Sequence, residues 1–125
     1  MRVLLVEDHA DTRELFVLFL SSQGFTVETA ASGLQAIDHA AAAAPDVVVL
    51  DLQLPGMDGW TTARHLRAHP ATCRTPIVAM SAHAYEHDQA RAHEVGCDAF
   101  VAKPCAPPEL LNAIHVACER RRRPR

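Results

Sequence analysis

The chain has 125 residues, of which 49% are hydrophobic and 22% are charged, a composition typical of one globular domain and not of a disordered segment. No stretch approaches the roughly 20 apolar residues that span a bilayer, and the opening MRVLLVED turns acidic too early for a signal peptide, so we expect a cytoplasmic protein without membrane association. The net charge of −3 combines a basic end of +4, at residues 119–125, with an acidic body of −7, which disfavours nucleic-acid binding.

Apolar or alternating runs and segments of helical periodicity follow one another along the whole chain. Gly24 and Gly96 are typical helix C-terminal stops, and Ser32 is placed to cap a helix start. In chain order, we predict a strand at residues 2–7, a helix at 10–24, a strand at 25–30, a helix at 33–44, a strand at 47–50, a helix at 59–68, a strand at 75–82, a helix at 84–95, a strand at 99–103 and a helix at 109–120.

This alternation predicts an α/β fold, because parallel strands need helical crossovers and are buried on both faces. We expect a five-stranded parallel sheet of order 2-1-3-4-5, covered by helices on both sides as a flavodoxin-like (βα)5 three-layer sandwich. One domain should occupy residues 1–118. Residues 119–125 are expected to be a basic tail, disordered and solvated, or the stub of a linker.

Polar residues stand at the carboxyl ends of four predicted strands. Glu7 and Asp8 end the first, Asp51 the third, Ser81 the fourth and Lys103 the fifth. If strands 1 and 3 are neighbours, three carboxylates share one crevice and repel one another unless a cation lies among them. Oxygen ligands with room for water suit Mg²⁺. Carboxylates, a metal, a lysine and a hydroxyl together suit a phosphoryl group, which one carboxylate can accept.

At these residues the chain resembles the receiver domain of two-component response regulators. The resemblance covers residues 2 to about 118 and rests on four motifs, each of them weak alone. In order along the chain, they are specific because each falls at the end of a predicted strand. The motifs are VEDH at residues 6–9, LDLQLPGMDG at 50–59, MSAH at 80–83 and AKPC at 102–105.

The resemblance implies a role for each acidic residue of the crevice. Asp51 would be the phosphoacceptor, and Glu7 and Asp8 would be the acids that hold Mg²⁺. Asp51 itself and the backbone carbonyl of Gln53 would add metal ligands.

The resemblance also implies roles around the acceptor. Lys103 would form an ion pair with the phosphoryl group, and the bond before Pro104 would be cis. Ser81 would hydrogen-bond the phosphoryl group and, with Phe100 as the switch aromatic, change the protein surface. Residues at the positions of Gln53 and His83 would tune dephosphorylation.

The function implied is phosphorelay signalling. A histidine kinase or phosphotransfer protein would supply the phosphoryl group to Asp51, and an unidentified protein target would bind the altered surface. The chain would catalyse only its own phosphorylation and dephosphorylation, as a monomer or weak dimer. It could be a free-standing regulator or a receiver from a longer hybrid histidine kinase.

Rival functions fit the residues less well. A phosphatase of the haloacid dehalogenase type needs a second aspartate two positions after the nucleophile, where this chain has Gln53. A flavodoxin-like nucleotide binder needs a loop rich in glycine and hydroxyl groups after the first strand, where acids stand instead. A degenerate receiver used only for protein contacts is disfavoured, because none of the acidic or basic site residues is missing.

Overall fold

The computed structural model describes residues 1–82 and 86–122. Five strands alternate with five helices, which confirms the predicted order of elements. They are β1 Arg2–Val6, α1 Ala10–Ser22, β2 Thr26–Ala30, α2 Gly33–Ala42, β3 Val47–Asp51, α3 Gly59–Ala68, β4 Ile77–Ser81, α4 Glu86–Glu94, β5 Ala99–Ala102 and α5 Pro107–Arg122. Within the described ranges, no helix has the length and apolarity needed to cross a bilayer.

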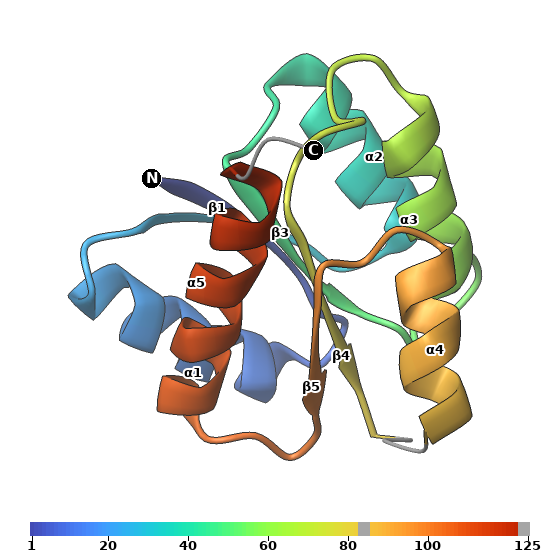
Figure 1. The fold of residues 1–125 in the computed structure, drawn as a ribbon. Coiled ribbons are helices and arrows are strands. Elements are labelled where there is room, and N and C mark those ends of the chain that lie inside the picture. The colour runs from blue at the N-terminus through green and yellow to red at the C-terminus, as the bar shows by residue number, and fades with distance from the viewer. Residues whose placement is uncertain (83–85, 123–125) are drawn as a thin grey trace.

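The strands form one parallel sheet in the order β2-β1-β3-β4-β5, as predicted (Figure 1). Its register aligns the ends of the strands. Val6 pairs with Leu50 across β1 and β3, and Ser81 pairs with Ala102 across β4 and β5. The residues that end or follow these strands therefore meet at one edge of the sheet.

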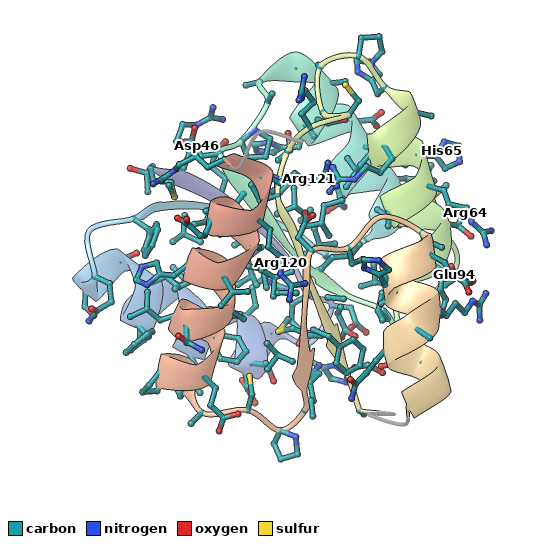
Figure 2. All side chains as sticks on the ribbon, in the orientation of Figure 1. Asp46, Arg64, His65, Glu94, Arg120 and Arg121 are labelled. Atoms are coloured by element: carbon teal, nitrogen blue, oxygen red, sulfur yellow. The ribbon has the colours of Figure 1, made fainter. Side chains whose placement is uncertain are left out.

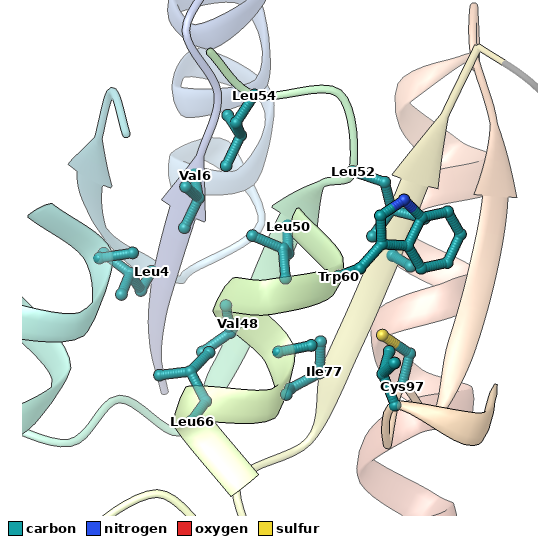
Figure 3. Close-up of a cluster of buried hydrophobic side chains, with 14 of the residues drawn as sticks. Leu4, Val6, Val48, Leu50, Leu52, Leu54, Trp60, Leu66, Ile77 and Cys97 are labelled. Carbon is teal, nitrogen blue, oxygen red and sulfur yellow. The ribbon is translucent and has the colours of Figure 1, made fainter. Parts of the chain in front are cut away.

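Helices cover both faces of the sheet, with α1 and α5 on one side and α2, α3 and α4 on the other (Figure 1). Alternate residues of β3 pack into the two hydrophobic cores, one on each face of the sheet. Val48 and Leu50 pack toward the α2, α3 and α4 side, whereas Val47 and Val49 pack toward α1 and α5. Figure 3 shows the first of these cores, where Trp60 lies among aliphatic side chains. Burial on both faces explains why β1, β3 and β4 are apolar over most of their length, whereas the edge strand β2 contains Thr26, Glu28 and Thr29.

The start of α3 is built to lie against the end of β3. Asp58 caps the helix, since its Oδ1 accepts a hydrogen bond from Thr61 N at 2.8 Å. A Cβ atom on Gly59 would come within 2.5 Å of the backbone of Asp51 and Leu52. Glycine is therefore required for this close approach, and the loop that follows Asp51 is held against its strand.

The expected tail needs a correction. We predicted a last helix to residue 120 and a basic tail at residues 119–125, but α5 continues through Arg122, so residues 119–122 of that tail are helical. The reason is that two of the arginines are bound: Arg120 Nη1 donates to Asp98 O, and Arg121 Nε donates to Asp98 Oδ1, each at 2.8 Å. Figure 2 shows both side chains beside the end of α5. The last three residues of the predicted tail, 123–125, lie outside the described residues.

Asp98 ties three parts of the fold together. Its Oδ2 accepts hydrogen bonds from Arg67 Nη2 and from Ile77 N, both at 2.9 Å, and its Oδ1 accepts from Arg121. The Arg67 side chain is only 15% exposed, so its charge depends on this carboxylate and on nearby carbonyls such as Gly96 O. The network joins α3, the start of β4 and α5 through the residue that precedes β5.

Replacement of Asp98 should therefore cost stability. We expect Asp98→Ala to lower the free energy of unfolding by about 3 kcal/mol, because it leaves Arg67 poorly compensated and Ile77 N without an acceptor. Urea denaturation at neutral pH measures the change. Asp38→Ala, at an exposed position of α2, is the matched control and should change stability by less than about 0.5 kcal/mol. Equal stability of the two variants would contradict this role of Asp98.

Candidate functional site

The ends of four strands bring predicted site residues together at one edge of the sheet. Asp51 is the last residue of β3 and Ser81 the last of β4, while Glu7 and Lys103 directly follow β1 and β5. The side chains of Glu7, Asp51 and Ser81 are almost fully buried, with Asp51 only 2% exposed. A rigid sheet edge thus fixes the positions of two carboxylates, a hydroxyl and an ammonium group.

Lys103 joins the two buried carboxylates. Its Nζ lies 2.7 Å from Glu7 Oε1 and 3.0 Å from Asp51 Oδ2. Burial alone would lower the pKa of Lys103, but the hydrogen bonds and negative charges of Glu7 and Asp51 outweigh it, and the pKa is raised. Lys103 therefore remains a cation at neutral pH and neutralises part of the repulsion between the two acids.

The charged form of Glu7, unlike that of Lys103, is disfavoured overall. Burial disfavours its charged form, and although the hydrogen bond to Lys103 offsets part of this effect, the nearby Asp51 adds to it, so the pKa of Glu7 is raised above its ordinary value of 4.5. An ionised carboxylate at this position costs stability unless a further cation is bound.

This pKa shift predicts a pH-dependent effect of Glu7→Gln in a metal-chelating buffer. As the pH rises above 4.5, Glu7 ionises first in the unfolded chain, so the wild type loses stability until the folded-state pKa is passed. Glutamine does not ionise, so the variant does not lose stability in this way. The free energy of unfolding of Glu7→Gln relative to wild type should hence be higher at pH 7 than at pH 4, as measured by urea denaturation. A relative stability that falls between these pH values would contradict the shift.

A second group of side chains lies beside this pair. Glu7, Asp8 and His9 each offer one possible metal-ligand atom, and these atoms lie within 4.8 Å of one another. Asp8 Oδ1 is buried and has no hydrogen-bond partner among the described residues, although His9 Nδ1 is 3.4 Å away. A buried carboxylate oxygen without a hydrogen-bond donor is suited to bind a cation. The carboxylate ligands of Glu7 and Asp8 fit Mg²⁺, which prefers oxygen ligands. Asp51 instead contacts Lys103.

Gln53 contributes contacts that the sequence did not reveal. Its backbone N–H donates to Asp51 Oδ1 at 2.9 Å, and its side-chain Oε1 accepts from Ser81 Oγ and from Ala82 N, each at 3.1 Å. Only its place two residues after Asp51 gave a hint. Residues of the β3–α3 loop therefore reach both Asp51 and the end of β4.

Phe100 and the bond before Pro104 are the remaining predicted features that the structure describes. Phe100, on β5, is partly buried and packs against the core that contains Trp60. The Lys103–Pro104 bond is cis, as predicted. His83 lies outside the described residues. Arg91 of α4 places its guanidinium carbon 4.5 Å from the centre of the Trp60 ring, a contact that the sequence did not indicate.

Comparison with known proteins agrees with this geometry. The sequence matches the response regulator receiver domain family over residues 3–115. The transcriptional regulatory protein CreB of Escherichia coli is 36% identical over 119 residues, which are 94% of this chain and 51% of CreB. The polar-differentiation response regulator DivK of Brucella ovis is 30% identical over 112 residues, which are 90% of this chain and 91% of DivK.

One similar solved structure contains a metal ion. The receiver domain of the sensor histidine kinase PA1611 from Pseudomonas aeruginosa PAO1, with a magnesium ion coordinated in its active-site cleft, superposes with a TM-score of 0.86. It is 30% identical in sequence, and the match covers 94% of this chain and 97% of that domain.

The present chain spans about half the length of CreB but nearly the whole of DivK.

Proposed function

This chain belongs to the response regulator receiver domain family, and from that premise we propose that it accepts a phosphoryl group on Asp51 in a two-component phosphorelay. The observation that carries the proposal is the contact of Asp51 Oδ2 with Lys103 Nζ at 3.0 Å, at the end of β3 and beside the end of β4. A buried carboxylate in contact with a lysine and near a hydroxyl is suited to accept and hold a phosphoryl group.

The proposed reaction transfers the group from a phosphohistidine. A carboxylate oxygen of Asp51 attacks phosphorus, the phosphorus–nitrogen bond breaks, and the histidine nitrogen leaves with the electron pair and takes up a proton. The product is an aspartyl phosphate. Water later attacks its phosphorus, which releases inorganic phosphate and restores the carboxylate. The chain would therefore catalyse only reactions of its own side chain.

The residues around Asp51 have separate tasks in this proposal. Lys103 would bind a phosphoryl oxygen, and its raised pKa keeps it charged for that purpose. The hydroxyl of Ser81 would donate a hydrogen bond to the group. Glu7, Asp8, Asp51 and the backbone carbonyl of Gln53 would hold Mg²⁺. Bound there, Mg²⁺ would neutralise negative charge on the phosphoryl oxygens.

A mass measurement tests the proposal. Incubation with Mg²⁺ and acetyl phosphate, a small-molecule donor, should raise the intact mass by that of one phosphoryl group. The same incubation with a chelator in place of Mg²⁺ should leave the mass unchanged. A folded protein whose mass does not change under either condition would refute phosphoacceptor function.

Phosphorylation would be transmitted through Ser81 and Phe100. A phosphoryl group adds nearly two negative charges and would draw the Ser81 hydroxyl toward it. Phe100, on the neighbouring strand, could then move farther into the core. α4 is mostly polar, and among its described side chains, at residues 88–94, Ala92 alone is buried, so we expect the helix to shift with Phe100.

NMR spectroscopy checks this switch. Addition of beryllofluoride, a phosphoryl analogue, together with Mg²⁺ should change the chemical shifts of Ser81, Phe100 and α4 as well as those around Asp51. Changes confined to the loops around Asp51 would show that phosphorylation does not reach β5 and α4.

Family membership also supports a proposal for the cellular setting. We propose a cytoplasmic protein that receives its phosphoryl group from a histidine kinase or phosphotransfer protein and then binds a downstream protein. Gln53 and His83 would tune the lifetime of the phosphorylated form. DivK and the receiver of PA1611 illustrate the two contexts open to it, a separate regulator and part of a kinase.

A further inference from the structure

The side chain of Gln53 engages hydrogen-bond donors at the end of β4. Its Oε1 accepts from Ser81 Oγ and from Ala82 N, each at 3.1 Å. A backbone N–H can only donate, so the carbonyl oxygen of Gln53, and not its NH₂ group, must face Ala82. One amide oxygen therefore receives both hydrogen bonds.

The same residue also contacts the acceptor through its backbone. The backbone N–H of Gln53 donates to Asp51 Oδ1 at 2.9 Å, so Gln53 connects Asp51 with the end of β4. Asp51 is 2% exposed and Ser81 is fully buried, whereas Gln53 is an exposed residue of the β3–α3 loop. An incoming group needs space at Asp51, and the Gln53 side chain can move into water, where its amide remains hydrogen-bonded.

We propose that the carboxamide of Gln53 is an internal substitute for a phosphoryl oxygen, which holds the Ser81 and Ala82 donors in the unphosphorylated protein and is displaced when Asp51 is phosphorylated. This inference rests on the proposed function. A phosphoryl oxygen is anionic, so it accepts from the same donors more strongly than a neutral amide oxygen does. The exchange therefore favours the phosphorylated form once the group is attached.

This exchange lowers the apparent affinity of the site for a phosphoryl group or its analogue. Every ligand that uses the two donors must first break their hydrogen bonds to Gln53, and its apparent affinity falls accordingly. Removal of the Gln53 acceptor should strengthen binding of a phosphoryl analogue roughly ten-fold, since two neutral hydrogen bonds no longer have to be exchanged.

Beryllofluoride binding at saturating Mg²⁺ tests the inference in four proteins: wild type, Gln53→Ala, Gln53→Met and the control Gln23→Ala. Each variant keeps the backbone carbonyl at position 53. Alanine removes both the acceptor and the bulk of the side chain, whereas methionine keeps similar bulk and offers only a weak acceptor. Both Gln53 variants should bind about ten-fold more tightly than wild type. Gln23→Ala, at an exposed position after α1, should match wild type.

A second readout follows the donor itself. The amide NMR signal of Ala82 should differ between unliganded wild type and both Gln53 variants, and the difference should vanish when beryllofluoride is bound. Tighter binding by Gln53→Ala alone would show that bulk, not hydrogen bonding, limits access, and would overturn the inference. Affinities equal to that of wild type in both variants would overturn it as well. If no folded protein in the set, wild type included, binds beryllofluoride, the proposed function itself is refuted and the inference with it.

Discussion

Asp51→Asn is expected to abolish phosphoryl uptake from acetyl phosphate. Asparagine has nearly the same shape, and its single carbonyl oxygen can replace one of the two carboxylate oxygens that accept from Gln53 N and from Lys103 Nζ. Its amide is a very poor nucleophile toward phosphorus. Loss of a nucleophile commonly reduces the rate by a factor on the order of 10³ or more, so the mass of the variant should not change over the time in which wild type is fully modified.

A matched control separates this effect from a general change of charge. Asp38→Asn removes the same charge at an exposed position of α2 and should take up the phosphoryl group as wild type does. Uptake by Asp51→Asn at the wild-type rate would show that another residue is the acceptor.

The second large effect is expected at the metal acids. Asp8→Asn should weaken Mg²⁺ binding at least ten-fold, which corresponds to about 1.4 kcal/mol of binding free energy. The substitution preserves the shape of the side chain but removes the negative charge beside Glu7, where Asp8 Oδ1 is buried without a hydrogen-bond donor among the described residues. Isothermal titration calorimetry measures the affinity, and the fluorescence of Trp60, the single tryptophan, offers a second signal.

Asp11→Asn is the control for this experiment. Asp11 is an exposed acid in the first turn of α1, close in sequence to Asp8 but outside the group formed by Glu7, Asp8 and His9. Its replacement should leave the affinity for Mg²⁺ within about two-fold of wild type, because exposed charges interact weakly through water. Similar affinities in Asp8→Asn and wild type would show that Asp8 does not hold the ion.

The sheet and its order could be predicted because the signals are local and repeated. The strands are apolar or alternating runs, the helices show helical periodicity, and Gly24 and Gly96 mark two helix ends, so the alternation itself implies a parallel sheet. The end of α5 could not be predicted in this way. Its last turn is helical because Arg120 and Arg121 bind Asp98, a residue more than twenty positions away, and a run of arginines by itself resembles a solvated tail.

The candidate site likewise has one part that the sequence predicts and another that it does not. The convergence of Glu7, Asp51, Ser81 and Lys103 follows from the strand ends, which are visible in the sequence, and from the strand order expected for a fold of this class. The side-chain contacts are not visible there. Whether Lys103 lies between Glu7 and Asp51, or the Gln53 amide reaches Ser81, depends on competition among several donors and acceptors within hydrogen-bonding distance of one another.

The position of the phosphoryl group is the most direct test of the function proposed for this chain. Treatment of the acetyl phosphate-modified protein with borohydride reduces an aspartyl phosphate to homoserine, which marks the modified residue permanently. Peptide mass spectrometry should then find homoserine at position 51 in wild type and in Asp38→Asn, and at no position in protein incubated without Mg²⁺. Homoserine at another aspartate, or a phosphoryl group that remains on a histidine, would contradict the assignment of Asp51 as the phosphoacceptor.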